Sequence, residues 1–87
     1  MSKHSIEFTP IAAKQLRKLS HEIQVRIAKA VDKLSINLFP SGFKKLSGQK
    51  DLYRIRVGDY RIVYQFNAGK LVILIVRVGH RKDIYNF

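Results

Sequence analysis

The stretch RIRVGDYRIVY, residues 54–64, has the composition of two strands joined by a tight turn at Gly58 and Asp59. A two-residue turn fixes which residues lie opposite one another, and residues at alternate positions share a face of the sheet. One face of the hairpin is then apolar and consists of Tyr53, Ile55, Val57, Tyr60, Ile62 and Tyr64. The stretch therefore predicts an antiparallel strand pair whose apolar face packs against the rest of the chain.

The other face of this hairpin places Arg56 directly opposite Arg61, with Arg54 two residues along the strand. Like charges directly opposite on a sheet destabilise it by about 0.2–1 kcal/mol, so folding alone gains nothing from them. One interpretation is an anion site, in which planar guanidinium groups converge on a phosphate. The other is a solvated sheet face whose cations protect the edge against aggregation. The hairpin by itself leaves both interpretations open.

The apolar run LVILIV, residues 71–76, predicts a strand over 71–78 that lies inside the sheet, because both of its faces are apolar. Such a strand would deliver four more polar side chains to the three arginines: His80, Arg81, Lys82 and Tyr85. This density of cations favours the anion site. A register extended across the turn NAGK, residues 67–70, would place Arg77 near Tyr60 on the apolar face, whereas a slip of one residue would reverse that placement.

The N-terminal half predicts a strand and two helices. The segment KHSIEF, residues 3–8, alternates loosely and stops before Thr9 and Pro10, which suit an N-cap and a first helical residue. Apolar residues recur at helical spacing from 11 to 19. A capping serine then starts a second helix, whose apolar stripe runs over 23–34 at steps of three and four.

The order of these elements predicts an α+β fold: an N-terminal strand, an antiparallel two-helix hairpin, and a three-stranded antiparallel meander over 52–57, 60–66 and 71–78. A helical hairpin on one face of a mostly antiparallel sheet is the natural two-layer arrangement. The chain contains no repeat and no linker, and its 87 residues suffice for one small core. We therefore expect a single domain over residues 1–87.

Composition points to a cytoplasmic protein with an anionic partner. The chain contains no cysteine, lacks an apolar leader at its N-terminus, and has no apolar run long enough to span a bilayer, so we expect no membrane association. Seventeen lysines and arginines against six acidic residues give a net charge of +11. Such a field steers a small domain toward polyanions such as nucleic acid or an acidic protein. The excess is larger over residues 41–87 (ten basic, three acidic) than over residues 1–40 (seven and three).

Two segments carry a resemblance to a known family: KKLSGQKDLYRIRVGDYRIVYQ, residues 44–65, and LVILIVRVGHRKDIY, residues 71–85. They resemble the RelE branch of the RelE/ParE superfamily of type II toxin–antitoxin toxins, and the resemblance covers essentially the whole chain. The segment RVGDYRIVY is characteristic of the superfamily in general. The segment VGHRKDIY is nearer to RelE than to the gyrase-directed ParE branch.

The resemblance implies a ribosome-dependent endoribonuclease, or mRNA interferase, that cuts mRNA in the ribosomal A site. It implies as partners a cognate antitoxin, mRNA and the ribosome with its 16S rRNA, and operator DNA contacted through the antitoxin. The implied reaction is attack of a ribose 2′-hydroxyl on the adjacent phosphate, without a cofactor. No cluster of His, Asp, Glu or Cys in the sequence has metal-ligand spacing, so we expect a metal-free mechanism.

By resemblance the catalytic residues are Arg54, Arg56, Arg61, Arg81 and Tyr85, although the family often has lysine at the first two positions. Tyr85 and Arg81 are the candidates for base and acid. The ordinary pKa values of tyrosine and arginine side chains lie far above neutral pH. Either residue transfers protons efficiently only where its surroundings shift that pKa. Arg54 and Arg56 would favour the tyrosinate, and Arg61 would hold the phosphate.

Four further residues are candidates for nucleic-acid binding. Lys44, Lys45 and Lys82 would contact ribosomal RNA phosphates, or serve solubility alone. His80 is better explained as a surface residue beside a turn; the alternative is an acid or base, because histidine titrates near neutral pH. Two other functions stay open: a ParE-like inhibitor of DNA gyrase that cleaves no RNA, and a non-catalytic basic module that binds nucleic acid.

Overall fold

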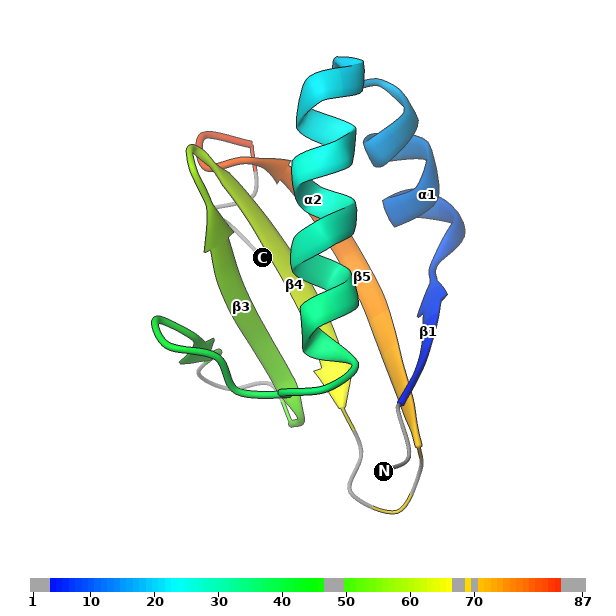
Figure 1. Ribbon diagram of the computed structural model, residues 1–87, viewed down its shortest axis with the longest axis vertical. Coiled ribbons are helices and arrows are strands. Elements are labelled where there is room, and N and C mark those ends of the chain that lie inside the picture. The colour runs from blue at the N-terminus through cyan, green and yellow to red at the C-terminus, as the bar shows by residue number, and fades with distance from the viewer. Residues whose placement is uncertain (1–3, 47–49, 67–68, 70, 84–87) are drawn as a thin grey trace.

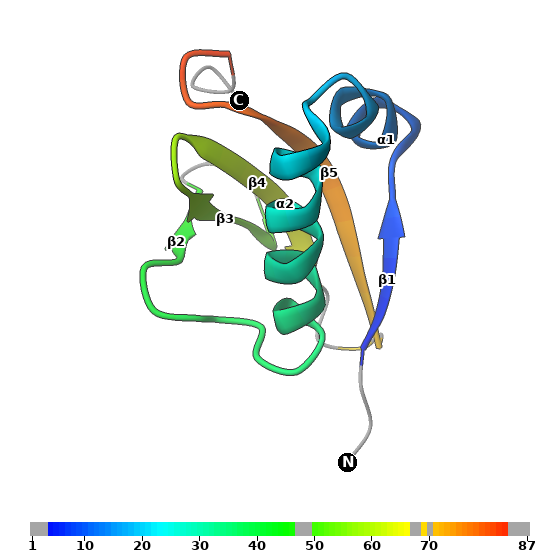
Figure 2. The ribbon, with the colours of Figure 1, turned by 45° about the horizontal axis from the view of Figure 1, so that its top comes forward.

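The computed structural model describes residues 4–46, 50–66, 69 and 71–83. Its elements follow one another along the chain as β1 (Ser5–Phe8), α1 (Pro10–Arg17), α2 (His21–Leu34), β2 (Lys44–Lys45), β3 (Leu52–Val57), β4 (Tyr60–Phe66) and β5 (Val72–His80). Both helices lie on the same face of a sheet with strand order β1-β5-β4-β3-β2 (Figures 1 and 2). The predicted α+β class and order of elements are confirmed.

The hairpin of β3 and β4 has the register that the two-residue turn predicts. Arg56 lies opposite Arg61, Ile55 opposite Ile62, and Tyr53 opposite Tyr64. β1 joins the sheet in parallel with β5, which makes the sheet mixed at one edge. The short strand β2 at the other edge was not predicted, because two residues are too few to show any periodicity.

Of the two placements that the sequence left open for Arg77, the structure has the one away from Tyr60 and the apolar face. Arg77 lies opposite Val63, whereas Tyr60 lies opposite His80. A register shift between Val63 and Tyr64 puts one extra residue, Val76, into β5, and such a bulge changes the face on which the following residues lie. Nothing in the alternation of the apolar run LVILIV marks that position, so the sequence could not place the bulge.

The helix boundaries follow from their caps. Thr9 Oγ1 accepts a hydrogen bond from the Ala12 N–H (3.1 Å), and Ser20 Oγ accepts one from the Ile23 N–H (3.4 Å). Both caps satisfy donors of the first turn that have no partner within the helix. Among the helices that the structure describes, none has the length and apolarity needed to cross a bilayer.

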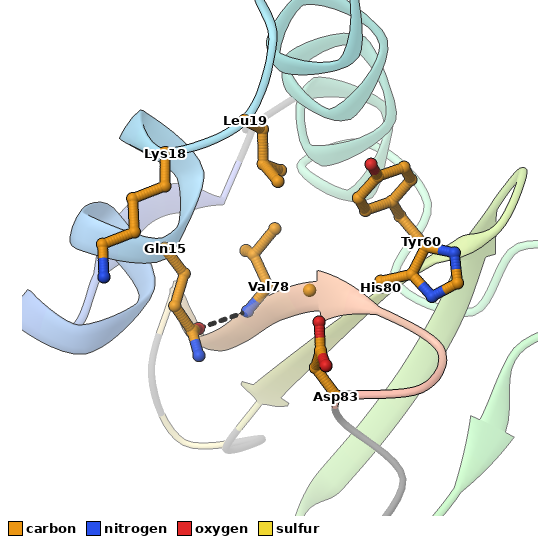
Figure 3. Close-up of a pocket in the computed structure, with 8 residues that line it drawn as sticks. Gln15, Lys18, Leu19, Tyr60, Val78, His80 and Asp83 are labelled. Atoms are coloured by element: carbon orange, nitrogen blue, oxygen red, sulfur yellow. Dashed lines mark hydrogen bonds between the residues drawn. The ribbon is translucent and has the colours of Figure 1, made fainter.

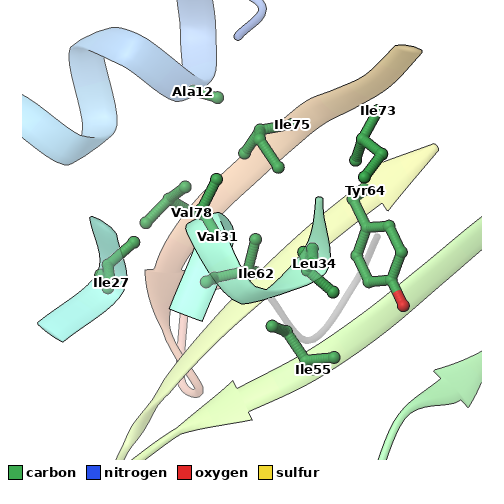
Figure 4. Close-up of a cluster of buried hydrophobic side chains, with 10 residues drawn as sticks. All are labelled: Ala12, Ile27, Val31, Leu34, Ile55, Ile62, Tyr64, Ile73, Ile75 and Val78. Atoms are coloured by element: carbon green, nitrogen blue, oxygen red, sulfur yellow. The ribbon is translucent and has the colours of Figure 1, made fainter. Parts of the chain in front are cut away.

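The main core lies between the helices and the sheet (Figure 4). Buried residues of α2 pack on the apolar faces of the three central strands, and the cluster comprises Ala12, Ile27, Val31, Leu34, Ile55, Ile62, Tyr64, Ile73, Ile75 and Val78. The opposite face of the sheet carries a smaller cluster around Leu52 and Val63. The helices therefore leave that opposite face of the sheet uncovered.

Side chains around α1 complete the edge of β5 where β1 ends. β1 pairs with β5 only over Val72 to Ile75. Beyond that point Thr9 Oγ1 donates to the Val76 carbonyl (2.9 Å), and the Val78 N–H donates to Gln15 Oε1 (2.8 Å). Since these bonds replace the missing strand partner, α1 fixes the end of β5 and the residues that follow it.

Candidate active site

Basic side chains gather on the uncovered face of the sheet. Arg56 and Arg61 lie directly opposite each other, and Arg54, Val63 and Arg77 form the next row across β3, β4 and β5. Lys44 lies opposite Arg54 and extends that row onto β2. Because residues paired across strands share a face, these side chains form one surface. We call it the basic face, which consists of Lys44, Arg54, Arg56, Arg61 and Arg77.

Arg61 is the buried centre of the basic face, with 9% of its surface exposed. Its Nη1 donates to the carbonyl of Tyr60 (3.2 Å) and, more weakly, to that of Gly58 (3.5 Å). Burial lowers the pKa of Arg61, nearby Arg56, Arg54 and Arg81 lower it further, and Asp59 opposes them. A buried cation surrounded by cations is unfavourable for folding, because the charge loses its hydration and is repelled by its neighbours. A bound anion would offset both the lost hydration and the repulsion.

The turn between β3 and β4 brings Arg81 to the same place. Gly58 has φ 61, a conformation that glycine adopts without the penalty other residues have. The Arg81 N–H donates to the Asp59 carbonyl (2.8 Å), which holds the chain after β5 against the turn. Arg54, Arg56, Arg61 and Arg81 therefore lie around one end of one hairpin. Tyr85, the fifth predicted catalytic residue, lies outside the described residues.

Arg26 of α2 also reaches this turn, from the side of the helices. A Cβ atom added to Gly58 would lie 3.3 Å from Arg26 Nη2, so the guanidinium group rests against the glycine. Arg26 does not belong to the apolar stripe of α2, and the sequence assigned it no functional role. No local pattern could have found this contact, because it joins residues from two elements that only the folded chain brings together.

His80 lies on the helix side of the sheet, apart from the basic face. Its ring meets that of Tyr60 edge-on, with centroids 5.4 Å apart, and its Nδ1 accepts a hydrogen bond from the Lys82 N–H (3.2 Å). Lys45 lies opposite Tyr53, so it also points away from Lys44 and the basic face. The nucleic-acid-binding roles of these lysines and of His80 stay predictions.

A pocket of about 270 Å³ opens beside His80, between the C-terminal part of α1, the connection from α1 to α2, the start of β4 and the end of β5 (Figure 3). Its lining is partly apolar, from Leu19 and Val78, and partly polar, from Gln15, Lys18, Tyr60, His80 and Asp83. Among the residues that the structure describes, no group of three His, Cys, Asp or Glu side chains could hold a metal ion. On the other side of the sheet, the basic face offers a set of fixed cations around the nearly buried Arg61.

Such an arrangement can bind a phosphodiester and stabilise it as it reacts. Guanidinium groups bind phosphate oxygens through two parallel N–H donors, and they remain charged at neutral pH. Donors that are already fixed where negative charge develops stabilise a transition state without reorganising. The β3–β4 turn supplies this rigidity, because Arg61 bonds to its carbonyls and Arg81 is held by its backbone.

Comparison with known proteins gives matches in both sequence and fold. Residues 6–85 match the family model described as "ParE toxin of type II toxin-antitoxin system, parDE". A RelE-like protein of Escherichia coli is 38% identical over 89 residues, which cover 97% of this chain and 92% of that protein. The mRNA interferase toxin RelE of Escherichia coli K12 is 30% identical over 86 residues, which cover 93% of this chain and 88% of that protein.

Among solved structures, the archaeal RelE–RelB complex from Pyrococcus horikoshii contains a chain that superposes with a TM-score of 0.80. The two are 30% identical, and the match covers 91% of this chain and 96% of that chain. Both the sequence and the fold therefore confirm the resemblance carried by residues 44–65 and 71–85. The chain belongs to the RelE/ParE superfamily of type II toxin–antitoxin toxins, and within it to the RelE type.

Proposed function

We propose that this protein is the toxin of a type II toxin–antitoxin pair and acts as a ribosome-dependent mRNA endoribonuclease, cutting mRNA in the A site and so inhibiting translation. The observation that carries the proposal is Arg61, a nearly buried cation with Arg54, Arg56 and Arg81 around it at one turn. This arrangement does not stabilise the fold, but it would stabilise the negative charge of a reacting phosphodiester. The name of the similar Escherichia coli mRNA interferase supports the same activity.

In the proposed reaction a ribose 2′-oxygen attacks the adjacent phosphorus, and the bond from phosphorus to the 5′-oxygen of the next nucleotide breaks. The 2′-hydroxyl loses a proton and the leaving 5′-oxygen gains one, so the products are a 2′,3′-cyclic phosphate and a 5′-hydroxyl. Arg61 holds a phosphate oxygen, and Arg54 and Arg56 stabilise the charge that develops on the phosphorane. As the base, Tyr85 accepts the proton of the 2′-hydroxyl. As the acid, Arg81 donates a proton to the leaving 5′-oxygen.

The partners in this proposal are of two kinds. A cognate antitoxin holds the toxin inactive and carries the complex to operator DNA, and the similarity to the toxin in an archaeal RelE–RelB complex supports such a partner. The ribosome and its 16S rRNA present the mRNA, with Lys44, Lys45 and Lys82 as contacts to RNA phosphates. The net charge of +11 suits both an acidic antitoxin and RNA.

Translation in a purified ribosomal system tests the activity. A defined mRNA is translated with wild type, Arg81→Ala, Tyr85→Phe and the control Lys33→Ala, and cuts are mapped by primer extension. Lys33 is an exposed cation of α2, so its removal changes the net charge by the same amount as Arg81→Ala. We expect cuts at A-site codons with wild type and Lys33→Ala that vanish with the other two variants. Intact mRNA with wild type would contradict the proposal.

A second candidate function is inhibition of DNA gyrase, which the match to a ParE family model favours. A gyrase inhibitor needs no acid or base at a phosphodiester, so it should tolerate Arg81→Ala and Tyr85→Phe. A supercoiling assay with the same four proteins separates the two functions. RNA binding without either activity would leave the non-catalytic basic module.

A further inference from the structure

Gly58 lies between two guanidinium groups that come from different layers of the molecule. Arg61 of β4 approaches from the basic face and places Nη1 3.5 Å from the Gly58 carbonyl oxygen. Arg26 of α2 approaches from the helix side, with Nη2 3.3 Å from where a Cβ atom of residue 58 would lie. Because Arg81 is bonded to Asp59, three arginines from three parts of the chain meet at a turn of two residues.

Arg26 gains little stability in this position. Its side chain is exposed, and exposed charges contribute little to folding even when they are paired. The long, flexible side chain could extend into solvent elsewhere along α2, yet its guanidinium group rests against a turn that already carries Arg61 and Arg81. A guanidinium group held at this turn, on the side of the helices, is placed to bind an anion that passes over Gly58 from the basic face.

We propose that Arg26 binds an RNA phosphate next to the one that is cleaved, from the helix side of the β3–β4 turn. The inference rests on the proposed function and extends it, because Arg26 then continues the phosphate contacts from the basic face around Gly58 onto α2. A single strand that passes over the turn meets Arg61 on one side and Arg26 on the other. Glycine at position 58 leaves room for this guanidinium group, since a Cβ atom there would force Arg26 to shift by a few tenths of an ångström.

The contact between Arg26 and an RNA phosphate is tested by removing the charge of each in turn. Four proteins are compared on programmed ribosomes: wild type, Arg26→Ala, Arg26→Lys and the control Lys33→Ala, which removes an exposed cation from the same helix. The mRNA carries a neutral methylphosphonate in place of one phosphate at a time, at each position flanking the cut. Single-turnover cleavage rates are measured at subsaturating toxin, and melting temperatures establish that every variant is folded.

We expect Arg26→Ala to lower the cleavage rate on unmodified mRNA about fivefold to tenfold, the loss of one charge-assisted contact at an exposed site. Arg26→Lys should recover part of the rate, because it keeps the charge without the planar fork. At one flanking position the methylphosphonate should slow wild type and Lys33→Ala but have no further effect on Arg26→Ala. A purely structural role of Arg26 would give no such position.

The failure of this inference differs from the failure of the proposed function. If wild type cleaves but Arg26→Ala matches Lys33→Ala, or if the effects of Arg26→Ala and of the methylphosphonate multiply at every position, Arg26 contacts no phosphate and only the inference is overturned. If wild type leaves the mRNA intact, the proposed function and the inference fall together.

Discussion

At the scale of single residues, the basic face carries like charges that oppose the stability of the fold. Arg56 and Arg61 lie directly opposite each other on neighbouring strands, and Arg61 is nearly buried. A cross-strand pair of opposite charges or of β-branched residues would stabilise the same rung of the sheet. The chain keeps two like charges there, which is expected of a site that is completed by an anion.

Arg56→Thr should therefore stabilise the protein while it weakens cleavage. The substitution removes one of the opposing charges and introduces a residue that suits a strand, so we expect a gain of about 0.5 kcal/mol in the free energy of unfolding. Urea unfolding at low salt measures it, and the gain should shrink at high salt because exposed charges are screened. A loss of stability that does not depend on salt would contradict this account of the pair.

Tyr64 is the basis of a second prediction, which concerns how the stability of the protein depends on pH. Its hydroxyl donates to the Leu38 carbonyl (2.6 Å), and burial, with a smaller contribution from Tyr53, raises its pKa well above the ordinary value. The folded state therefore holds this proton more tightly than the unfolded state, in which tyrosine ionises near pH 10. The stability that this proton contributes is complete below about pH 10 and is lost as the pH rises through the folded pKa.

Tyr64→Phe should thus be less stable than wild type at pH 8, by about 1 kcal/mol for the lost hydrogen bond. The difference should narrow above about pH 10, by up to about 1.4 kcal/mol for each pH unit. Urea unfolding of both proteins between pH 8 and pH 11 measures the two trends. If the difference in the free energy of unfolding stays constant from pH 8 to pH 11, ionisation of Tyr64 does not contribute to the pH dependence of stability.

At the scale of elements, α1 replaces a strand along the last part of β5. The Val78 N–H has Gln15 Oε1 as its acceptor, where a longer β1 would have supplied a carbonyl. Gln15→Leu leaves this N–H without a partner, and we expect a loss of about 1–3 kcal/mol in stability with faster hydrogen exchange at the Val78 amide. Gln15→Glu keeps an acceptor oxygen and should retain most of the protection. Equal rates of hydrogen exchange at the Val78 amide in Gln15→Leu and Gln15→Glu would argue against the hydrogen bond to Gln15.

The elements also mark how far the sequence predicts the fold. The tight turn at Gly58 and Asp59 sets the register of β3 and β4, so the facing pair of Arg56 and Arg61 follows from sequence alone. The bulge at Val76 does not follow, because a run that is apolar on both faces has no alternation to interrupt. For this reason the sequence left the face of Arg77 open, and the structure places Arg77 opposite Val63.

The site was predictable to the same extent. Arg54, Arg56 and Arg61 belong to one hairpin, and resemblance added Arg81, which the structure places at the same turn. Arg26 could not be predicted, since its contact with Gly58 depends on the position of α2 over the sheet. Lys45 follows Lys44, and His80 follows Gly79, the residue opposite Arg61. Both lie on the other side of the sheet, because neighbouring strand residues alternate between faces.

At the scale of the whole molecule, the net charge of +11 predicts RNA binding that depends strongly on salt. If Arg54, Arg56, Arg61 and Arg81 each contact a phosphate, the logarithm of the affinity for single-stranded RNA should fall with the logarithm of salt concentration at a slope of about −3. Affinity then drops about fiftyfold between 50 and 200 mM salt. Fluorescence anisotropy with a 2′-O-methyl RNA measures this, and a slope near zero would contradict phosphate contacts.

In the proposed function, the cations around the β3–β4 turn cleave RNA through its own 2′-hydroxyl, with Arg61 at their centre. The most direct measurement is the single-turnover rate of mRNA cleavage on ribosomes for wild type and Arg61→Ala, with the chemical ends of the products determined. We predict a rate about 10²–10³-fold lower in Arg61→Ala, and 2′,3′-cyclic phosphate and 5′-hydroxyl ends with wild type. An unchanged rate in Arg61→Ala, or 5′-phosphate ends with wild type, would contradict the claim.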